Sequence, residues 1–409
     1  MKRVVVTGMG IICPIGLNID EFWTNLVAGK SGVSRISRFD TANSSVKVAG
    51  EVRNFDPTKY MNLKTVQRTR RGVHFAIPAT KEAVAQANLD MTKEQPERVG
   101  VISSNMLEHK FIADGWGSLR EGRRADPLFF TKASPSVVSL QLGMLLKARG
   151  PNTSVNSLCA SGADTIGTAL NFIRLGYADV MIAAASDASL DEMTVSALNV
   201  LGALTREPDP DKASRPFDRN RSGFVYGEGC GVLVLESLEH AQRREAPILA
   251  EVAGVGWIFD AYDATAPNPE TEAIAMRIAL QNAGVKPEEV DYINAHGTST
   301  KLNDVSETRA IKMVFGDRAY KIPISAHKSM FGHMVTAGGA VESIGAILSI
   351  NRGIIPPTIH YETPDPDCDL DYVPNVARKA EVNVCLKDSF GLGGQNCCLV
   401  LKKFRGDSG

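Results

Sequence analysis

The chain has 409 residues, of which 44% are hydrophobic and 22% are charged, a composition that is typical of a globular domain and excludes disordered, collagenous and coiled-coil chains. Its 45 lysines and arginines nearly balance 46 aspartates and glutamates, so the net charge of -1 provides no overall attraction to nucleic acid. The length suits two domains, or two fused halves of one large α/β unit.

Strand-like and helix-like patterns alternate along the chain. The strands are predicted at residues 3–7, 99–102, 180–184, 231–236, 248–255, 290–294, 322–325, 382–386 and 397–401. The helices are predicted at residues 19–28, 73–87, 160–175, 269–283, 307–315 and 338–352. This alternation predicts an α/β fold with mostly parallel, buried sheets.

The first predicted strand lies in a segment that loosely resembles a signal peptide. Lys2 and Arg3 precede a charge-free stretch, but glycines and Pro14 interrupt it and no cleavage site of small residues follows. We therefore expect a buried strand that runs into a glycine-rich loop. No apolar run reaches the ~18 residues of a membrane span, so we expect no membrane association.

The seven cysteines are scattered, with no Cys-x-x-Cys pair and no Cys/His cluster at zinc spacing. We therefore expect no bound metal. The odd number predicts reduced thiols in a cytoplasmic protein.

Two of the predicted helices form a weak internal repeat. Residues 160–174 align with 338–352, and the four identities are Ile166/Ile344, Gly167/Gly345, Leu170/Leu348 and Arg174/Arg352. Each helix follows a polar, potentially reactive stretch. We predict two similar halves, residues 1–246 and 247–409, which pack tightly because no linker-like segment separates them.

Cys159 lies between a short extended run and the helix at 160–175. Unpaired N–H groups and the helix dipole favour a thiolate at such a position, and small residues at 160–162 leave room for a substrate. The segment fits a nucleophile. It fits equally well a buried cysteine that packs as a small hydrophobic side chain.

Two histidines in the second half follow predicted strands. His296 stands at the carboxyl end of the strand at 290–294, where α/β sheets bind ligands, although a histidine bonded within its own loop is the simpler interpretation. His333 occupies the position in the repeat that Cys159 has in the first half. Lys328 shares its loop, and Glu342 lies on the next helix. A lysine in such an apolar loop is expected to be paired.

A glycine-rich segment at 391–394 is predicted to join the last two strands as a hairpin turn, with backbone N–H groups that can face a site. Phosphate binding is not favoured, because no lysine or helix follows at the P-loop spacing.

Taken in order, these segments resemble the β-ketoacyl-acyl carrier protein synthases of the thiolase superfamily. The elongating synthases of fatty-acid synthesis (KAS II) and the ketosynthase subunits of type II polyketide synthases are similar to the chain over nearly its whole length. The matching motifs lie at residues 4–10, 215–218, 223–229, 296–298, 328–333 and 364–366. The resemblance implies a duplicated five-stranded unit with two mixed sheets in α-β-α-β-α layers.

The resemblance also implies an acyltransferase that joins a cysteine-bound acyl chain to malonyl-acyl carrier protein, with loss of carbon dioxide and no enzyme-bound cofactor. Cys159 would be the acylated nucleophile, and His296 and His333 would promote decarboxylation. Lys328 would support the histidines. The backbone N–H groups of Cys159 and Leu392 would form the oxyanion hole.

Further residues receive supporting roles from the same resemblance. Glu342 would pair with Lys328, and Glu307 would be an acidic group near the site. Thr298 and Thr300 would contact the phosphopantetheine arm. The chemistry is consistent, because two neutral imidazoles can stabilise an enolate without a metal. A thiolase, by contrast, would have one such histidine and a second cysteine as base.

Three positions depart from the family pattern. Leu392 replaces a gating phenylalanine, Leu158 replaces a small residue before the nucleophile, and Met106 lies in a loop that is usually richer in glycine. All three are expected to line or gate the acyl pocket. They favour a specialised polyketide pathway over housekeeping fatty-acid elongation, which remains the alternative.

The basic run at residues 64–71 is the expected docking site for an acidic carrier protein, and a solvated helix start is the alternative. Its proposed contacts are Lys64, Arg68, Arg70 and Arg71. No aromatic residue interleaves with them, so RNA binding is not expected.

The family resemblance predicts a dimer, either a homodimer or a heterodimer with a chain-length-factor paralogue. A non-catalytic chain-length partner of the same fold is a further alternative, but such partners lack the cysteine that this chain has.

Overall fold

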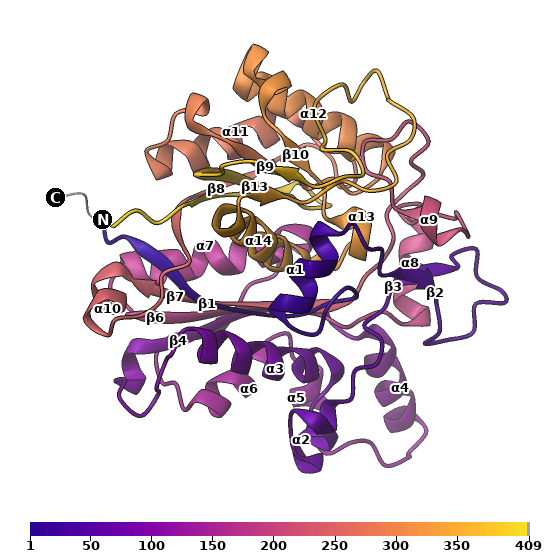
Figure 1. Cartoon of the computed structure of the whole chain (residues 1–409). Coiled ribbons are helices and arrows are strands. Elements are labelled where there is room, and N and C mark those ends of the chain that lie inside the picture. The colour runs from indigo at the N-terminus through magenta and orange to yellow at the C-terminus, as the bar shows by residue number, and fades with distance from the viewer. Residues whose placement is uncertain (407–409) are drawn as a thin grey trace.

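The computed structural model describes residues 1–406, whose main body has five layers, helices alternating with sheets (Figure 1). Helices α3 (Arg71–Gln86) and α6 (Val137–Leu146) cover one outer face, and α11 (Pro269–Ala283) and α12 (Lys301–Phe315) cover the other. Helices α7 (Ser161–Arg174) and α14 (Val335–Arg352) form the layer between the sheets. This confirms the predicted α-β-α-β-α fold.

The two sheets repeat one topology. The first contains β1 (Val4–Ile12), β4 (Val99–Asn105), β5 (Asn152–Ser154), β6 (Val180–Asp187) and β7 (Gly229–Ser237). The second contains β8 (Ala250–Phe259), β9 (Tyr292–Asn294), β10 (Ile324–Ser325), β13 (Val384–Phe390) and β14 (Gln395–Lys402). The spatial orders β5-β4-β6-β7-β1 and β10-β9-β13-β14-β8 correspond strand for strand. The sheets join where Val5 and Val6 of β1 pair with Glu251 and Ala250 of β8.

The expectation of mostly parallel strands is wrong. In the first sheet β4 runs parallel to β5 and β6, whereas β7 runs antiparallel to β6 and β1. The second sheet repeats this pattern, because β13 and β14 form a hairpin and β14 pairs antiparallel with β8. Each sheet is therefore mixed, and only its parallel strands need crossover connections.

The remaining elements are short or peripheral. The helices are α1 (Ile19–Val27), α2 (Leu63–Arg68), α4 (His109–Arg120), α5 (Phe129–Lys132), α8 (Glu192–Val200), α9 (Pro210–Ala213), α10 (Leu238–Arg243) and α13 (Lys328–Phe331). The strands are β2 (Val33–Arg35), β3 (Val48–Gly50), β11 (Ile354–Ile355) and β12 (Arg378–Lys379). None of the helices within residues 1–406 has the length and hydropathy that a membrane span requires.

Strand β1 does not turn into a loop after Val6, as the glycines suggested, but continues to Ile12. The glycines allow α3 to lie directly on the strand. A Cβ atom on Gly8 would stand 2.0 Å from the Ala83 carbonyl oxygen, and one on Gly10 would stand 1.9 Å from that of Ala79. Close helix–strand packing explains these glycines better than a turn does.

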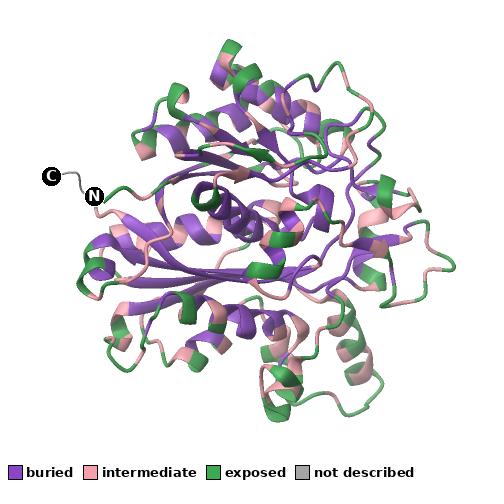
Figure 2. Ribbon diagram, in the orientation of Figure 1, coloured by how far each residue is buried: buried purple, intermediate pink, exposed green. Residues whose placement is uncertain are grey.

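The central layer brings the two halves of the repeat together. Helix α14 is buried from Val335 to Ile350, as Figure 2 shows, and its surface of small and apolar residues suits burial on all sides. A Cβ on Gly162 of α7 would lie 2.6 Å from the Ala340 nitrogen, and one on Gly339 would lie 2.5 Å from the Ala163 nitrogen. The two helices therefore touch near their N-termini, which sets the segments that precede them side by side.

Candidate active site

Cys159 lies in a single 3-10 turn, Leu158–Ala160, immediately before α7. Leu158 has a φ of 51°, a left-handed conformation that costs energy for a leucine. The segments around the two histidines also contain non-glycine residues with positive φ, Ser299 at 66° and Val335 at 24°. Strained backbone therefore occurs in or directly beside each of the three segments that carry Cys159 and the two histidines.

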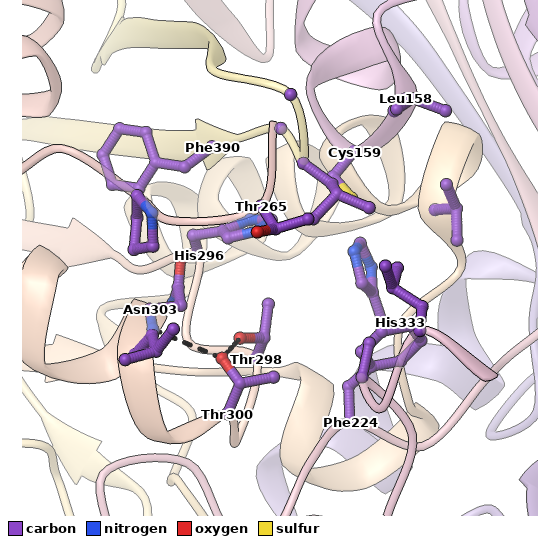
Figure 3. Close-up of a pocket in the computed structure, with 18 of the residues that line it drawn as sticks. Leu158, Cys159, Phe224, Thr265, His296, Thr298, Thr300, Asn303, His333 and Phe390 are labelled. Carbon is purple, nitrogen blue, oxygen red and sulfur yellow. Dashed lines mark hydrogen bonds between the residues drawn. The ribbon is translucent and has the colours of Figure 1, made fainter. Parts of the chain in front are cut away.

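The three segments open into one cavity of about 460 Å³. Its lining includes eight of the predicted site residues: Met106, Leu158, Cys159, His296, Thr298, Thr300, His333 and Leu392. Figure 3 shows the rings of His296 and His333 approaching Cys159 from two sides, with the threonines further along the cavity. The Oγ1 atoms of Thr298 and Thr300 are 2.9 Å apart. The residues expected to bind the phosphopantetheine arm and those expected to bind the acyl chain thus line the same cavity.

Cys159 and the two histidines are close enough to act on one ligand. The Cys159 Sγ and one nitrogen of each ring lie within 4.8 Å of one another. The rings are perpendicular, at 87°, with centroids 5.4 Å apart. Neither His333 ring nitrogen has a hydrogen-bond partner among the described residues, although the side chain is buried. Such groups suit a bound ligand, and a thiol with two imidazoles could also hold zinc.

Both imidazoles are neutral over the neutral pH range. Burial lowers the pKa of His296 and of His333 well below the ordinary value, and the nearby Lys328 lowers both further. The Lys328 ammonium stands 3.3 Å from His296 Nδ1. An ammonium can only donate, so Nδ1 is the acceptor and carries no proton. His296 therefore carries its proton on Nε2.

Lys328 is held by groups on two other segments. Its Nζ donates to Glu342 Oε1 at 2.5 Å and to the His296 carbonyl oxygen at 2.7 Å. Glu307 fixes the same loop from the other side, because its carboxylate accepts from the His296 N–H at 2.6 Å and from the Gly297 N–H at 2.8 Å. Glu307 thus acts on the backbone of the site.

Cys159 differs from expectation in its electrostatics. Burial raises the pKa of its thiol, while the N–H groups of Leu392 and Cys159 and the charge of Lys328 lower it. The sequence indicated the groups that favour a thiolate but not the desolvation that outweighs them. The two N–H groups near the sulfur are those predicted to form the oxyanion hole.

The predicted basic docking run is only partly available. Arg70 forms an ion pair with Glu108, and its guanidinium lies 4.0 Å from the Phe111 ring centroid. Arg71 makes two bonds to the buried Glu228, at 2.6 and 2.9 Å. These partners hold both arginines within the fold, whereas Lys64 and Arg68 of the run are exposed.

One buried lysine beside the site was not predicted from sequence. Lys387, on β13, is fully buried and forms an ion pair with Glu342. A lysine in an alternating strand ordinarily indicates a solvent-facing position, so the pattern gave no signal for its burial.

The chain is similar to known proteins over nearly its whole length. Residues 1–241 match the family model of the β-ketoacyl synthase N-terminal domain, and residues 249–362 match that of the C-terminal domain. The chain is 41% identical to 3-oxoacyl-[acyl-carrier-protein] synthase 2 of Coxiella burnetii and to that of Staphylococcus aureus strain COL. Each match covers 98% of this chain and 99% of the relative.

Solved structures share the whole fold. The ishigamide ketosynthase/chain length factor is 38% identical, with a TM-score of 0.92, and a type II PKS ketosynthase in complex with its acyl-carrier protein is 34% identical, with a TM-score of 0.90. Each match covers 99% of this chain and 100% of the solved chain. The chain therefore belongs to the β-ketoacyl synthase family, and it is a ketosynthase of the acyltransferase type.

Proposed function

We propose that this chain condenses an acyl group carried on Cys159 with malonyl-acyl carrier protein. The observation that carries the proposal is the meeting of one thiol, two neutral buried imidazoles and two backbone N–H groups in one cavity. The direct test incubates the protein with acyl- and malonyl-carrier protein and follows the cysteine adduct, carbon dioxide and the 3-ketoacyl product.

In the first half-reaction, the Cys159 sulfur attacks the acyl thioester and the carrier thiol departs with the proton. The carbonyl oxygen becomes an oxyanion, which the N–H groups of Cys159 and Leu392 stabilise.

In the second half-reaction, the C–C bond to the malonyl carboxylate breaks and carbon dioxide leaves. The electron pair forms an enolate, whose oxygen accepts from His296 Nε2–H and from His333. The enolate carbon then attacks the acyl group, and the Cys159 thiolate is expelled.

We place the enzyme in polyketide rather than fatty-acid elongation. Leu158, Met106 and Leu392 line the cavity where the family pattern has smaller or gating residues. One similar solved structure is named as a type II PKS ketosynthase, and another as a ketosynthase/chain length factor. Fatty-acid elongation is the second candidate, because the curated relatives are named 3-oxoacyl-[acyl-carrier-protein] synthase 2. Product analysis with both kinds of carrier protein separates the two. A chain-length partner without activity is disfavoured by Cys159.

Several broader features belong to the same proposal. The units are residues 1–246 and 247–409, supported by the matching strand orders. The protein acts as a dimer in the cytoplasm, with itself or with a chain-length paralogue, and needs no cofactor beyond the carrier's phosphopantetheine. Thr298 and Thr300 contact that arm. Native mass measurement after co-expression with a paralogue tests the assembly.

Leu392 tests the assignment of the acyl gate. Leu392→Phe adds a ring to a turn in which Gly393 and Gly394 have φ values of 92° and 84°. We expect kcat/KM for long, rigid unsaturated chains to fall roughly tenfold, with little change for short saturated ones. The backbone N–H is kept, so the oxyanion hole survives. Leu392→Ile, which keeps the volume, is the control, and proportional loss for both substrates would contradict the gate.

Carrier docking is tested on the exposed part of the basic run. Reversing Lys64 and Arg68 to glutamate should raise KM for carrier-bound substrate roughly tenfold and leave small thioester mimics unaffected, since rim charges act mainly on association. The effect should shrink as salt rises. The control is Lys286→Glu, an exposed lysine shortly after α11, a helix that Figure 1 shows on the opposite side of the molecule from α2. An unchanged KM would show that the basic run is a solvated surface without a docking role.

A further inference from the structure

Lys387 is a fully buried lysine, with 0% of its surface exposed. Its Nζ lies 2.9 Å from Glu342 Oε2 and 3.1 Å from Ser389 Oγ, and it also donates to the Asp388 carbonyl oxygen. Lys328 is bound to the other oxygen of the same carboxylate. One buried glutamate thus bridges two buried ammonium groups.

Glu342 does not need a second lysine to balance its negative charge. A single ion pair with Lys328 already compensates that carboxylate, and burying a further charge is costly when a methionine could fill the space. A reason for the second charge must therefore lie in the surrounding groups.

Carboxyl groups outnumber Lys328 around the histidines. Glu307 binds the backbone at His296, and Asp388 is buried with neither carboxylate oxygen hydrogen-bonded to a described residue. With Glu342, these make three buried carboxyl groups near the place where an enolate would develop negative charge. The remaining titratable groups around Lys387 are His296, His327, His333, Cys385, Cys397 and Cys398. Burial and the neighbouring Asp388 raise the pKa of Glu307 to about 8, so the carboxyl groups that carry charge at neutral pH are Glu342 and Asp388. Lys328 alone therefore leaves this environment negative, which would oppose the enolate.

Lys387 is placed to correct that balance. It pairs with Asn294 in the parallel β13–β9 register, two residues before His296, so a rigid sheet holds its charge near the histidines. Its positive charge lowers the pKa of both His296 and His333 and so favours the neutral imidazoles.

We propose that Lys387 is a positioning residue for the decarboxylation step, whose ammonium holds Glu342 between two lysines and keeps the surroundings of the histidine pair from becoming negative. The inference rests on the proposed function. It adds a charged residue that acts through Glu342 and the local field and does not touch the substrate.

The test compares Lys387→Met, Lys387→Arg and the exposed control Lys403→Met. For Lys387→Met we expect malonyl decarboxylation to fall about ten- to a hundredfold, less than the ~10²–10³ for a direct donor, with acyl loading of Cys159 retained. Removing the charge raises the pKa of the histidines. Because the neutral form is needed and activity is lost as pH falls through that pKa, the acid limb of the pH–rate profile should move to higher pH.

The charge-preserving Lys387→Arg should keep the wild-type profile, and Lys403→Met should keep both rate and profile. If Lys387→Met does not fold, the uncharged Lys387→Gln makes the same comparison. Equal loss of loading and decarboxylation in Lys387→Met, or an unshifted pH–rate profile at the wild-type rate, would overturn the proposed role of Lys387 and leave the proposed function standing. Absence of malonyl decarboxylation in the wild-type protein would overturn the proposed function and this role together.

Discussion

Cys159→Ala is expected to abolish both acyl loading and condensation, because no other group in the cavity can form the thioester. Intact-mass measurement after incubation with acyl-carrier protein should show an adduct on the wild-type protein and none on the variant. The six other cysteines are buried, which makes the signal specific. Cys13→Ala, at a buried position immediately after β1 and outside the cavity lining, is the control and should load normally. An adduct on Cys159→Ala would contradict the nucleophile.

The same position separates the two half-reactions. Cys159→Gln replaces the thiol with an amide that resembles the acylated state in size and polarity. We expect it to release carbon dioxide from malonyl-carrier protein without loading an acyl chain, since the histidines and Lys328 are intact. Measuring carbon dioxide in the absence of acyl substrate checks this expectation.

Elements with strong local signals were predictable from sequence. Helix α11 has the predicted bounds because Asn268 caps its start, Pro269 occupies the first turn, and Gly284 ends it with a φ of 62°. Helix α12 was predicted to begin at residue 307 but begins at Lys301, where the Thr300 side chain accepts from the Asn303 N–H. Thr300 is thus an N-cap residue that the predicted helix start did not take into account.

Long-range pairing set the limit of prediction at the site. The order of cysteine, histidines and glycine-rich turn identified the chemistry, and the crossing of α7 and α14 places those segments together. The burial of Lys387 depends on a glutamate on another element, and the loss of Arg71 from the docking run depends on Glu228, 157 residues away. Local sequence periodicity cannot predict partners that lie so far apart along the chain. Helices α4 and α6 were not predicted. Their N-cap positions hold Glu108 and Ser136, and neither side chain caps the helix that follows it.

His333→Ala is expected to lower malonyl decarboxylation by ~10²–10³ while acyl loading of Cys159 falls much less. Loading relies on the thiol and two backbone N–H groups, whereas the enolate relies on imidazole donors, and both His333 nitrogens are free of partners among the described residues. His296→Ala should behave similarly, with added loss because Lys328 would lose its contact with Nδ1.

Two comparisons distinguish donation from packing at position 333. His333→Gln keeps a neutral N–H donor and should retain more decarboxylation than His333→Ala, whereas His360→Ala, outside the cavity lining, should leave both half-reactions unchanged. Because burial holds the pKa of His333 well below its ordinary value, the wild-type rate should be flat over the neutral pH range and fall only in acid, where the imidazole gains a proton and its charge must be desolvated. Radiolabelled carbon dioxide release measures one half-reaction and intact mass the other. If both fall by the same factor in His333→Ala, the histidine supports the fold of the cavity rather than the enolate.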